Sequence, residues 1–570
     1  MIGYFNLVLH AHLPYVLGHG RWPHGTDWLN EAAAETYIPV LNLVNHLAAD
    51  GIAARLTIGI SPVLCEQLAH NAFIEEFGSY LDQKIKAAEE DYVQFKKFDQ
   101  REYIPLAEMW RDRYKSIKSS FERYNQNLIG EFRRLQDAGN LEVMTCGATH
   151  GYLPLLSQDT SCQAQVKQAV YSYERYFGRK PRGIWLPECA YRPSYNWNPP
   201  VEVDGLKGPY PRKGIEEFLS ENSLEYFVVD SSTLKGGKAI GVYIDRFEAL
   251  KTLWGQFERE FKPRKEEAEK TPQEVYLVGS REGRAPVAVF TRDPETGLQV
   301  WSGEWGYPGD GNYLDFHKKR YPGGHRYWKV TSAKSDLADK LIYDPGHALN
   351  RVPENAAHFS AMIKRILYDY HDKVGEPGVI CAPYDAELFG HWWFEGPKFI
   401  EQVLRNLHAE SDYQSLNCAA YKDLAAPNKV VSLPEGSWGE GGYHYIWLNE
   451  NTSWTWKHIY GFELRMQKLA QKCLETQNET LMELGRQAAR EFMLLSASDW
   501  QFLISTWAAR DYAEMRLDRH FRYFRRLADM IDSYSGALSD GEAEFLRELQ
   551  FQDNLFPDID LKWFARVEYP

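Results

Sequence analysis

The sequence predicts an α/β fold: an incomplete (β/α)7 barrel with insertions, followed by a C-terminal α-helical domain. Two observations lead to this prediction. Seven short apolar runs alternate with longer amphipathic segments, which is the pattern of buried parallel strands joined by helices. Polar residues follow every run, which favours the functional rim of a barrel over a doubly wound sheet, where strand ends matter mainly at the switch point. Seven strands instead of eight would make the barrel incomplete.

The predicted strands and helices follow one another along the chain. The strands are 5–10, 55–60, 141–146, 183–186, 225–229, 286–290 and 378–381. The helices between them include 28–49, 101–138, 161–177 and 355–370. Ser161 and Asn355 are the expected N-cap residues, because their side chains can accept a hydrogen bond from a free backbone N–H.

Two insertions and a change of character interrupt this alternation. The insertions cover about 192–213 and about 231–284, and the charged stretch 258–270 within the second predicts a solvated surface helix or hairpin. The Gly-rich and aromatic segment 301–328 predicts a cleft wall, since long loops in compact domains are usually functional. After residue 425 the character changes: a Gly- and Trp-rich stretch covers 433–455, and from about 456 to 548 the pattern is helical. We therefore expect a barrel domain over 1–425 and a helical domain over 426–570.

Composition limits the kinds of partner. A chain of 570 residues is too long for one simple core, so two or three domains are expected. The net charge of −14 argues against nucleic acid or an anionic membrane as partner, because both demand a basic surface. The 81 aromatic residues (18 Trp, 35 Tyr and 28 Phe) suit a core and also a cleft that stacks flat sugar rings. A neutral polymer such as a glucan is compatible with this charge.

The cysteine pattern and the N-terminus both predict a cytoplasmic protein. The seven cysteines are odd in number and widely spaced, without a Cys-x-x-Cys motif, which predicts reduced thiols and neither disulfides nor a zinc ribbon. The N-terminal apolar run is broken at His10 and His12, and no stretch reaches about 18 apolar residues. We therefore expect neither a signal peptide nor a transmembrane helix.

Two carboxylates stand directly after predicted strands and beside tryptophans. Glu188 follows the run 183–186, and Asp385 follows the run 378–381. Such a pair suits glycoside chemistry, with one carboxylate as nucleophile and the other as acid/base. Each could instead be a structural acid paired with an arginine. Glu387 is a rival to Asp385, because residues i and i+2 share a face on an extended segment, and its alternative role is a supporting hydrogen bond.

Other polar residues at the strand ends leave more than one interpretation open. His10 and His12 would share a face if the strand continues, and they could be metal ligands or donors to sugar hydroxyls, with the same choice for His150. A metal-dependent polysaccharide deacetylase would use the first option. Arg292 could pair with Glu188 or another cleft carboxylate, or lie on the surface beside Asp293. A non-catalytic glucan-binding protein would not need both carboxylates.

Five short motifs appear in a fixed order. They are HAHLPY at 10–15, THGYLP at 149–154, WLPECAY at 185–191, YDAELFGHW at 384–392 and WGEGG at 438–442. Together they resemble the motifs of glycoside hydrolase family 57, and the resemblance runs from the N-terminus to about residue 510. The segments 186–188 and 496–500 favour its 1,4-α-glucan branching enzymes. The family's incomplete (β/α)7 barrel and helical bundle agree with the strand count above.

The resemblance implies a retaining double displacement on an α-1,4-glucan such as amylose, glycogen or starch. Glu188 matches the nucleophile and Asp385 the general acid/base, which should have a raised pKa because it starts protonated. The barrel over 1–425 would be catalytic, and the helical domain would contribute to the cleft through Asp499. No cofactor and no metal are implied. The positions that match substrate-binding residues are Arg292, Gly309, Trp438 and Asp499, with His10, His12 and His150 as further candidates. Trp438 would be a stacking platform, and Gly309 would allow the backbone to approach a sugar ring closely.

Transfer to a glucan hydroxyl requires that water is kept from the covalent intermediate. Branching members carry a tyrosine on a loop after the fifth strand for this purpose, and Tyr243 is the candidate here. Amylase, amylopullulanase and 4-α-glucanotransferase activities on the same scaffold are the neighbouring alternatives. The sequence predicts neither the oligomeric state nor the length of the transferred chain.

Overall fold

Seven parallel strands form the centre of the protein. The structure is a computed structural model that describes residues 1–235, 270–279, 284–302 and 305–565. Within these residues the parallel strands run in the order β10-β1-β2-β3-β4-β7-β9. Their bounds are Gly378–Asp385 (β10), Gly3–Ala11 (β1), Leu56–Ile60 (β2), Leu141–Cys146 (β3), Gly183–Trp185 (β4), Tyr226–Val229 (β7) and Val287–Thr291 (β9).

The parallel strands close into the barrel that the sequence predicts. A parallel bridge between Arg292, just after β9, and Cys381 of β10 joins the two ends of the order. All seven predicted strands are confirmed. Every residue of β2, β3 and β9 is buried, because helices cover the outer face and side chains fill the interior. That double burial is the reason these strands appear in the sequence as unbroken apolar runs.

Short additional strands extend the sheet at its margins. β8 (Tyr276–Val278) pairs antiparallel with β9, and β12 (Val430–Val431) continues beyond β8. β11 (Tyr413–Ser415) lies beside β1. The first predicted insertion forms the hairpin of β5 (Tyr195–Trp197) and β6 (Tyr210–Arg212). Most of the second insertion, including Tyr243 and nearly all of the charged stretch 258–270, lies outside the described residues.

Helices surround the barrel. The four predicted helical segments are confirmed as helical, but 101–138 is divided into α5 (Ile104–Arg123) and α6 (Leu128–Asp137). The predicted helix 28–49 is divided into α1 and α2 by a π-helical turn at Ala33–Tyr37. The helices between the strands, among the described residues, are α1 (Thr26–Ala32), α2 (Ile38–Ala49), α3 (Pro62–Leu68), α4 (Asn71–Lys97), α5 (Ile104–Arg123), α6 (Leu128–Asp137), α7 (Asp159–Phe177), α8 (Ile215–Glu221), α9 (Ser231–Lys235), α11 (Pro294–Trp301), α12 (Pro345–Val374), α13 (Gly396–His408) and α14 (Cys418–Leu424).

Both predicted N-caps are wrong. The first turns of these helices are polar, so an apolar pattern places the helix starts too late. α7 begins two residues before Ser161. α12 begins at Pro345, where the Asp344 carboxylate accepts hydrogen bonds from two backbone N–H groups of the first turn. Asn355 lies inside α12, and its side-chain amide donates to the Tyr313 hydroxyl at 2.8 Å.

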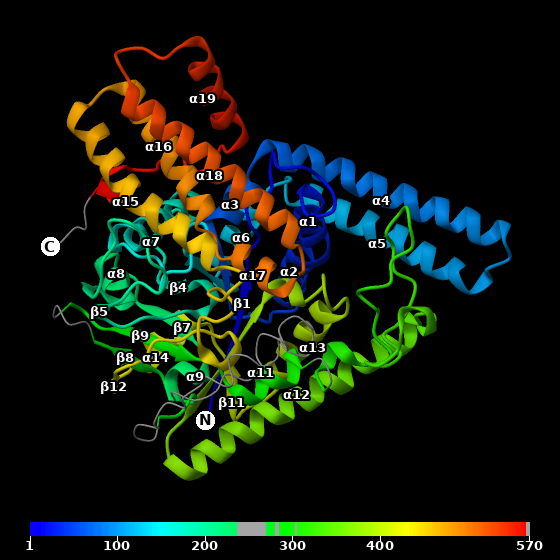
Figure 1. Ribbon diagram of the computed structural model, residues 1–570. Coiled ribbons are helices and arrows are strands. Elements are labelled where there is room, and N and C mark those ends of the chain that lie inside the picture. Colours follow the sequence, from blue (N-terminus) through cyan, green and yellow to red (C-terminus); the bar gives the residue numbers. More distant parts are fainter. Residues whose placement is uncertain (236–269, 280–283, 303–304, 566–570) are drawn as a thin grey trace.

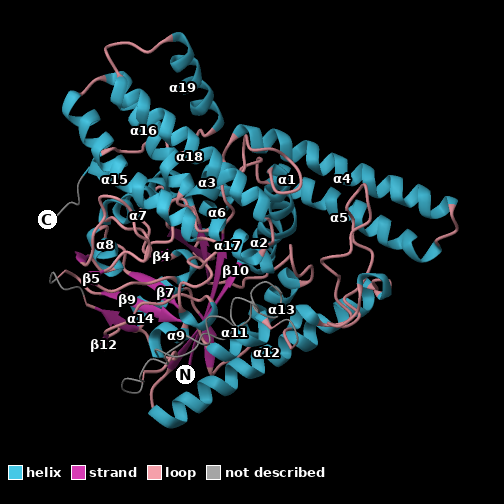
Figure 2. Ribbon diagram, in the orientation of Figure 1, coloured by secondary structure: helices cyan, strands magenta, loops and turns pink. Residues whose placement is uncertain are grey.

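The C-terminal region is helical, as predicted. Its helices are α15 (Ser453–Thr476), α16 (Glu479–Leu495), α17 (Asp499–Thr506), α18 (Arg510–Ser533), α19 (Asp540–Gln552) and α20 (Lys562–Ala565). Figure 1 shows β1 running from the N-terminus toward α17, with α15, α16 and α18 layered over that end of the barrel. Figure 2 shows the strands at the centre and the α4–α5 hairpin projecting to one side.

The length and polarity of the helices bear on membrane association. None of the helices in the described ranges combines the length and the apolar character needed to cross a bilayer.

Candidate active site

Three histidines stack at the carboxyl ends of β1 and β3. The rings of His12 and His150 are nearly parallel, with centroids 3.9 Å apart, and the His10 and His150 centroids are 5.2 Å apart. The His10 ring rests on Trp185 of β4 at 4.7 Å. The rings of His10 and His12 are also stacked, at 6.0 Å, which confirms the prediction that they share a face.

Glu188 follows β4 and is held by donors from two distant segments. The indole Nε1–H of Trp438 donates to one carboxylate oxygen at 2.8 Å, and the Ser498 hydroxyl donates to the other at 3.2 Å. The backbone N–H of Trp438 also donates to the Glu188 carbonyl at 3.1 Å. Glu188 has a φ of 61°, a conformation that costs of order 1–3 kcal/mol and persists only where the surroundings impose it.

The surroundings of this carboxylate shift the ionisation of several groups. Burial raises the pKa of Glu188 to about 7, and the hydrogen bond from Trp438 opposes this rise. Burial also lowers the pKa of His10 and of His150 well below the ordinary value, with a further lowering from the charge of His12. Both buried histidines are therefore neutral at pH 7.

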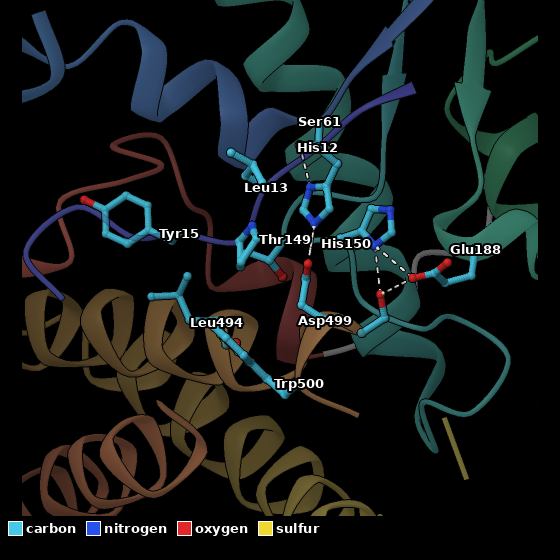
Figure 3. Close-up of polar contacts among 12 residues, drawn as sticks. His12, Leu13, Tyr15, Ser61, Thr149, His150, Glu188, Leu494, Asp499 and Trp500 are labelled. Carbon is cyan, nitrogen blue, oxygen red and sulfur yellow. Dashed lines mark hydrogen bonds and ion pairs between the residues drawn. The ribbon is translucent and has the colours of Figure 1, made fainter. Parts of the chain in front are cut away.

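The C-terminal region reaches the barrel rim through Asp499. Its carboxylate accepts a hydrogen bond from His12 Nε2 at 3.0 Å, while His12 Nδ1 meets the Ser61 hydroxyl at 2.8 Å (Figure 3). Figure 3 places Glu188 on the opposite side of His150 from His12. Asp499 is the first residue of α17, so a helix of the C-terminal region brings it to the histidines of the barrel.

Asp385 stands at the same rim as Glu188. It is the last residue of β10, and the strand register pairs it with His10 of β1. Burial raises the pKa of the Cys189 thiol well above its ordinary value, and the charges of Glu188 and Asp385 add to this rise. Both carboxylates therefore lie within electrostatic reach of one thiol.

The structure separates Glu387 from Asp385. The expectation that the two share the face of an extended segment is wrong, because a 3-10 helix begins directly after Asp385. Glu387 is buried, and its carboxylate accepts from the Tyr37 hydroxyl at 2.6 Å and from the His12 backbone N–H at 3.1 Å. These contacts match the supporting hydrogen-bond role that the sequence left as the alternative for Glu387.

Arg292 is a buried residue of the rim. Its Nε lies 2.9 Å from a carboxylate oxygen of Asp230, which follows β7, and the two side chains are 5% and 0% exposed. The interpretation of Arg292 as a surface residue beside Asp293 is therefore wrong, and pairing with another strand-end carboxylate is confirmed. Gly309 ends a short 3-10 helix after α11. Its contact with substrate stays a prediction.

Sequence reasoning missed Ser498 and gave Trp438 a different role. The sequence predicts Trp438 as a stacking platform, whereas the residue is only 6% exposed, its indole N–H donates to Glu188, and its ring lies edge-to-face with Trp185. Ser498 is separated from Glu188 by 310 residues, and its hydroxyl is small and common. The motif SASDW carried the signal, but only Asp499 within it was singled out.

A cavity of about 720 Å³ opens between the N-terminal segment 19–25 and the segment 507–515 that follows α17. Trp22 and Trp507 line it and are largely exposed. The first segment begins seven residues after His12, and the second begins eight residues after Asp499. Exposed aromatic faces in a concave site are suited to flat, weakly polar rings.

The histidine cluster also meets a geometric condition for holding a metal ion. One atom each of His12, His150 and Asp499 lie within 4.8 Å of one another, and the same is true of His10, Cys146 and His150. His10 Nε2, both nitrogens of His150 and His12 Nε2 already have hydrogen-bond partners in one another, in Ser498 or in Asp499, whereas His10 Nδ1 has none among the described residues. Burial raises the pKa of the Cys146 thiol and so keeps it protonated.

Comparison with known proteins identifies the family. The model of glycosyl hydrolase family 57 matches residues 6–434. The chain belongs to glycosyl hydrolase family 57. A second model, the C-terminal region of 1,4-alpha-glucan branching enzymes, matches residues 458–564. The family 57 barrel and the helical region with Ser498 and Asp499 are thus matched separately.

Full-length relatives of this family 57 protein include branching enzymes. The chain is 41% identical to a 1,4-alpha-glucan branching enzyme of Thermococcus kodakarensis over 98% of its own length and 78% of the relative. The crystal structure of the Thermococcus enzyme aligns with a TM-score of 0.89, covering all of this chain and 98% of the other. A branching enzyme of Pyrococcus horikoshii is 39% identical, with a TM-score of 0.87 and coverage of 100% and 98%.

An amylase shares the same architecture. The alpha-amylase AmyC of Thermotoga maritima is 29% identical, with a TM-score of 0.81 and full coverage of both chains. The fold alone therefore does not separate chain transfer from hydrolysis.

Proposed function

We propose that this protein is a 1,4-α-glucan branching enzyme. It cleaves an α-1,4 bond and transfers the released chain to a 6-hydroxyl of a glucan, which forms an α-1,6 branch. One observation carries the proposal: the C-terminal region that matches the branching-enzyme model supplies Ser498 to Glu188 and Asp499 to His12. The region that matches the branching-enzyme model is thus in contact with the carboxylate assigned as nucleophile and with its neighbours.

The reaction runs in two displacements. Glu188 attacks the anomeric carbon while Asp385 donates its proton to the departing glucosyl oxygen, so that a glycosyl-enzyme ester forms as the α-1,4 bond breaks. Asp385, now a carboxylate, then takes the proton of the acceptor 6-hydroxyl, whose oxygen displaces Glu188. Two inversions retain the α configuration. This course needs the two carboxyl groups about 5–5.5 Å apart.

The ionisation states needed for the first step differ between the two carboxylates. Glu188 must be ionised, and its hydrogen bonds from Trp438 and Ser498 favour that state against burial. Asp385 must begin protonated, so we expect a raised pKa for it. The neutral histidines His10 and His150 add no positive charge that would favour ionisation of Asp385.

The remaining site residues would bind the glucan. His10, His12 and His150 would orient or contact sugar hydroxyls, together with Arg292, Gly309, Trp438 and Asp499. The exposed faces of Trp22 and Trp507 offer further stacking surfaces. Tyr243 is proposed to exclude water from the intermediate. No cofactor takes part, and the reaction would serve glycogen or starch synthesis in the cytoplasm.

The test is proton NMR of linear amylose incubated with the protein and with Glu188→Gln. New α-1,6 anomeric signals from the unchanged protein, absent with the variant, would support branching and the nucleophile together. Rising reducing ends without α-1,6 signals would instead assign an amylase, the alternative that the similarity to the Thermotoga alpha-amylase keeps open. Redistribution of α-1,4 chain lengths alone would assign a 4-α-glucanotransferase.

A further inference from the structure

A continuous chain of hydrogen bonds leads from the barrel interior to Glu188. His10 Nε2 and His150 Nε2 are 3.0 Å apart, His150 Nδ1 and Ser498 Oγ are 2.8 Å apart, and Ser498 Oγ lies 3.2 Å from Glu188 Oε1. Trp438 meets the other carboxylate oxygen from the opposite end. These groups come from β1, from the segments after β3 and β4, and from two segments beyond residue 430.

The backbone fixes the middle of this chain. The Ser498 N–H donates to the His150 carbonyl at 3.0 Å, and Gly151 forms an antiparallel bridge with Ala497. His150 itself has a φ of 61°, so its ring is presented from a strained conformation that these contacts hold in place. Ser498 is fully buried. The distance between the imidazole and the hydroxyl is therefore set by the fold and does not depend on a mobile side chain.

The chemistry of the end groups decides the direction of every bond. An indole N–H can only donate, so Trp438 accepts nothing from Glu188. An ionised carboxylate can only accept, so the Ser498 hydroxyl must donate its single proton to Glu188. The serine oxygen must then accept from His150, which places the proton of that neutral ring on Nδ1. His150 Nε2 is left as an acceptor, so His10 must carry its proton on Nε2.

The unused atom at the start of the chain agrees with this direction. His10 Nδ1 is buried and has no hydrogen-bond partner among the described residues. If the bonds donate from His10 toward Glu188, called here the forward direction, His10 Nδ1 carries only a lone pair. If they donate in the reverse direction, His10 Nδ1 would be a buried N–H without an acceptor. Orphaned buried N–H groups are rarer in native structures than under-used acceptors. The forward direction is thus the one that the interior tolerates better.

We propose that Ser498 is a positioning residue for the nucleophile, and that His10, His150 and Ser498 form a relay of hydrogen bonds. While Glu188 is ionised, every bond of this relay donates toward its carboxylate, which keeps Glu188 ionised and oriented for attack. The relay rests on the proposed function, because it matters only if Glu188 is the nucleophile. Protonation of Glu188 reverses every bond: the carboxyl donates to Ser498, Ser498 to His150 Nδ1, and His150 Nε2 to His10. The tautomer of His150 therefore reports the charge on Glu188.

Neutron diffraction of the deuterated protein and of its Glu188→Gln variant tests the relay directly. The oxygen of the new amide should face Trp438, which can only donate, so its NH2 group should face Ser498. We expect a deuteron on Nδ1 of His150 in the unchanged protein above pH 8 and on Nε2 in the variant. The same tautomer in both crystals would overturn the relay.

The pH dependence of kcat/KM on amylose provides the second measurement. Removing one hydrogen bond to an ionised carboxylate should move the acidic limb of Ser498→Ala upward by about one pH unit. Ser496→Ala is the matched control, because Ser496 is equally buried but donates to the Phe492 carbonyl instead. Its acidic limb should stay in place. An unmoved limb in Ser498→Ala, or an equal shift in both variants, would contradict the proposal.

The assignment of Glu188 as the nucleophile and the proposed relay would be overturned by different results. If Glu188→Gln cleaves amylose at the unchanged rate, the assignment of the nucleophile fails. If Glu188→Gln is inactive while the His150 tautomer does not change, the relay alone fails. Should Ser498→Ala not fold, as judged by its melting curve, the diffraction experiment still decides, because it leaves Ser498 intact.

Discussion

Two clusters of histidine and carboxylate side chains join the N-terminal part of the chain to the C-terminal helices, and they differ in exposure. The rim cluster is the site described above, in which the side chains of His12, Asp499 and Glu188 are 9%, 13% and 14% exposed. The deep cluster is buried throughout, at 0% for each side chain, and consists of His19, Glu491, His520 and Asp553. The same chemical groups therefore occur in two settings within one protein.

The side chains of the deep cluster are joined by hydrogen bonds. Arg516 donates to His520 Nε2 at 2.9 Å, so His520 donates from Nδ1 to Glu491 at 2.8 Å. His19 in turn donates from Nε2 to Asp553 at 2.6 Å. Burial lowers the pKa of both histidines, as it does for His10 and His150. At the rim, by contrast, the series of hydrogen bonds ends at the partly exposed carboxylate of Glu188. The rim cluster is therefore suited to a reaction, and the buried deep cluster to stabilising the fold.

Replacing the nucleophile should separate the two clusters most clearly. Glu188→Gln is expected to lower kcat for glucan cleavage at least a thousandfold, because loss of a covalent nucleophile removes a whole reaction path. The amide keeps the shape of the side chain, so circular dichroism should show an unchanged fold. Initial rates on amylose measure the effect. A loss of less than tenfold would move the chemistry away from the rim cluster.

Opening the deep cluster should affect stability instead. His520→Ala removes two buried hydrogen bonds, from Arg516 and to Glu491, and leaves a cavity, which should lower the free energy of unfolding by about 2–5 kcal/mol. Urea unfolding followed by tryptophan fluorescence gives the value. At a temperature well below the melting transition, kcat should stay within twofold of the original. A large loss of kcat with normal stability would show that the two clusters are coupled.

The barrel and the two carboxylates were predictable because their signals are local. Each parallel strand is buried on both faces and appears in the sequence as an unbroken apolar run, and Glu188 and Asp385 follow two such runs directly. Helix starts were less accessible: the Asp344 cap of α12 precedes a polar, Pro-containing first turn that carries no apolar period. Local patterns thus locate elements well and their ends poorly.

Partners across long sequence separations could not be predicted. Trp438 lies 250 residues and Ser498 310 residues from Glu188, and only the packing of the C-terminal helices on the barrel brings them together. The pairing of Arg292 with Asp230 was accessible as an alternative, because both residues follow strands of the same barrel. The ends of parallel strands gather at one rim of a barrel, but no such rule places a residue that precedes a helix of the C-terminal region, as Ser498 does, beside a strand end.

The free-energy cost of ionising the buried Glu188 should appear as a pH-dependent difference in stability between the unchanged protein and Glu188→Gln. The pKa of Glu188 is raised from 4.5 to about 7 in the folded state, so folding binds a proton between these values and stability falls as pH rises through them. The full cost, up to about 3 kcal/mol, applies above pH 7. Glu188→Gln never titrates and escapes it.

Melting curves of Glu188→Gln and the unchanged protein measure this difference. The variant should be the more stable of the two at pH 8, and the advantage should disappear below about pH 4.5, where the carboxyl is protonated in both folded and unfolded states. A constant difference at all pH values would mean that repacking, and not the charge of Glu188, is responsible. The deep cluster, whose carboxylates stay in place, supplies the same background in both proteins.

Chelation should have the smallest effect, and it tests whether either cluster holds a metal ion. Both clusters bring three possible ligand atoms within 4.8 Å, so geometry alone would allow a metal ion in either. In both, however, protein partners engage the histidine nitrogens, with the exception of His10 Nδ1 at the rim. Arg516 donates directly to His520 of the deep cluster, where a cation would be repelled. Dialysis against EDTA should therefore change neither the branching rate nor the melting temperature. Loss of activity restored by zinc would assign a metal to the rim cluster and favour a deacetylase-like chemistry, whereas loss of stability alone would assign it to the deep cluster.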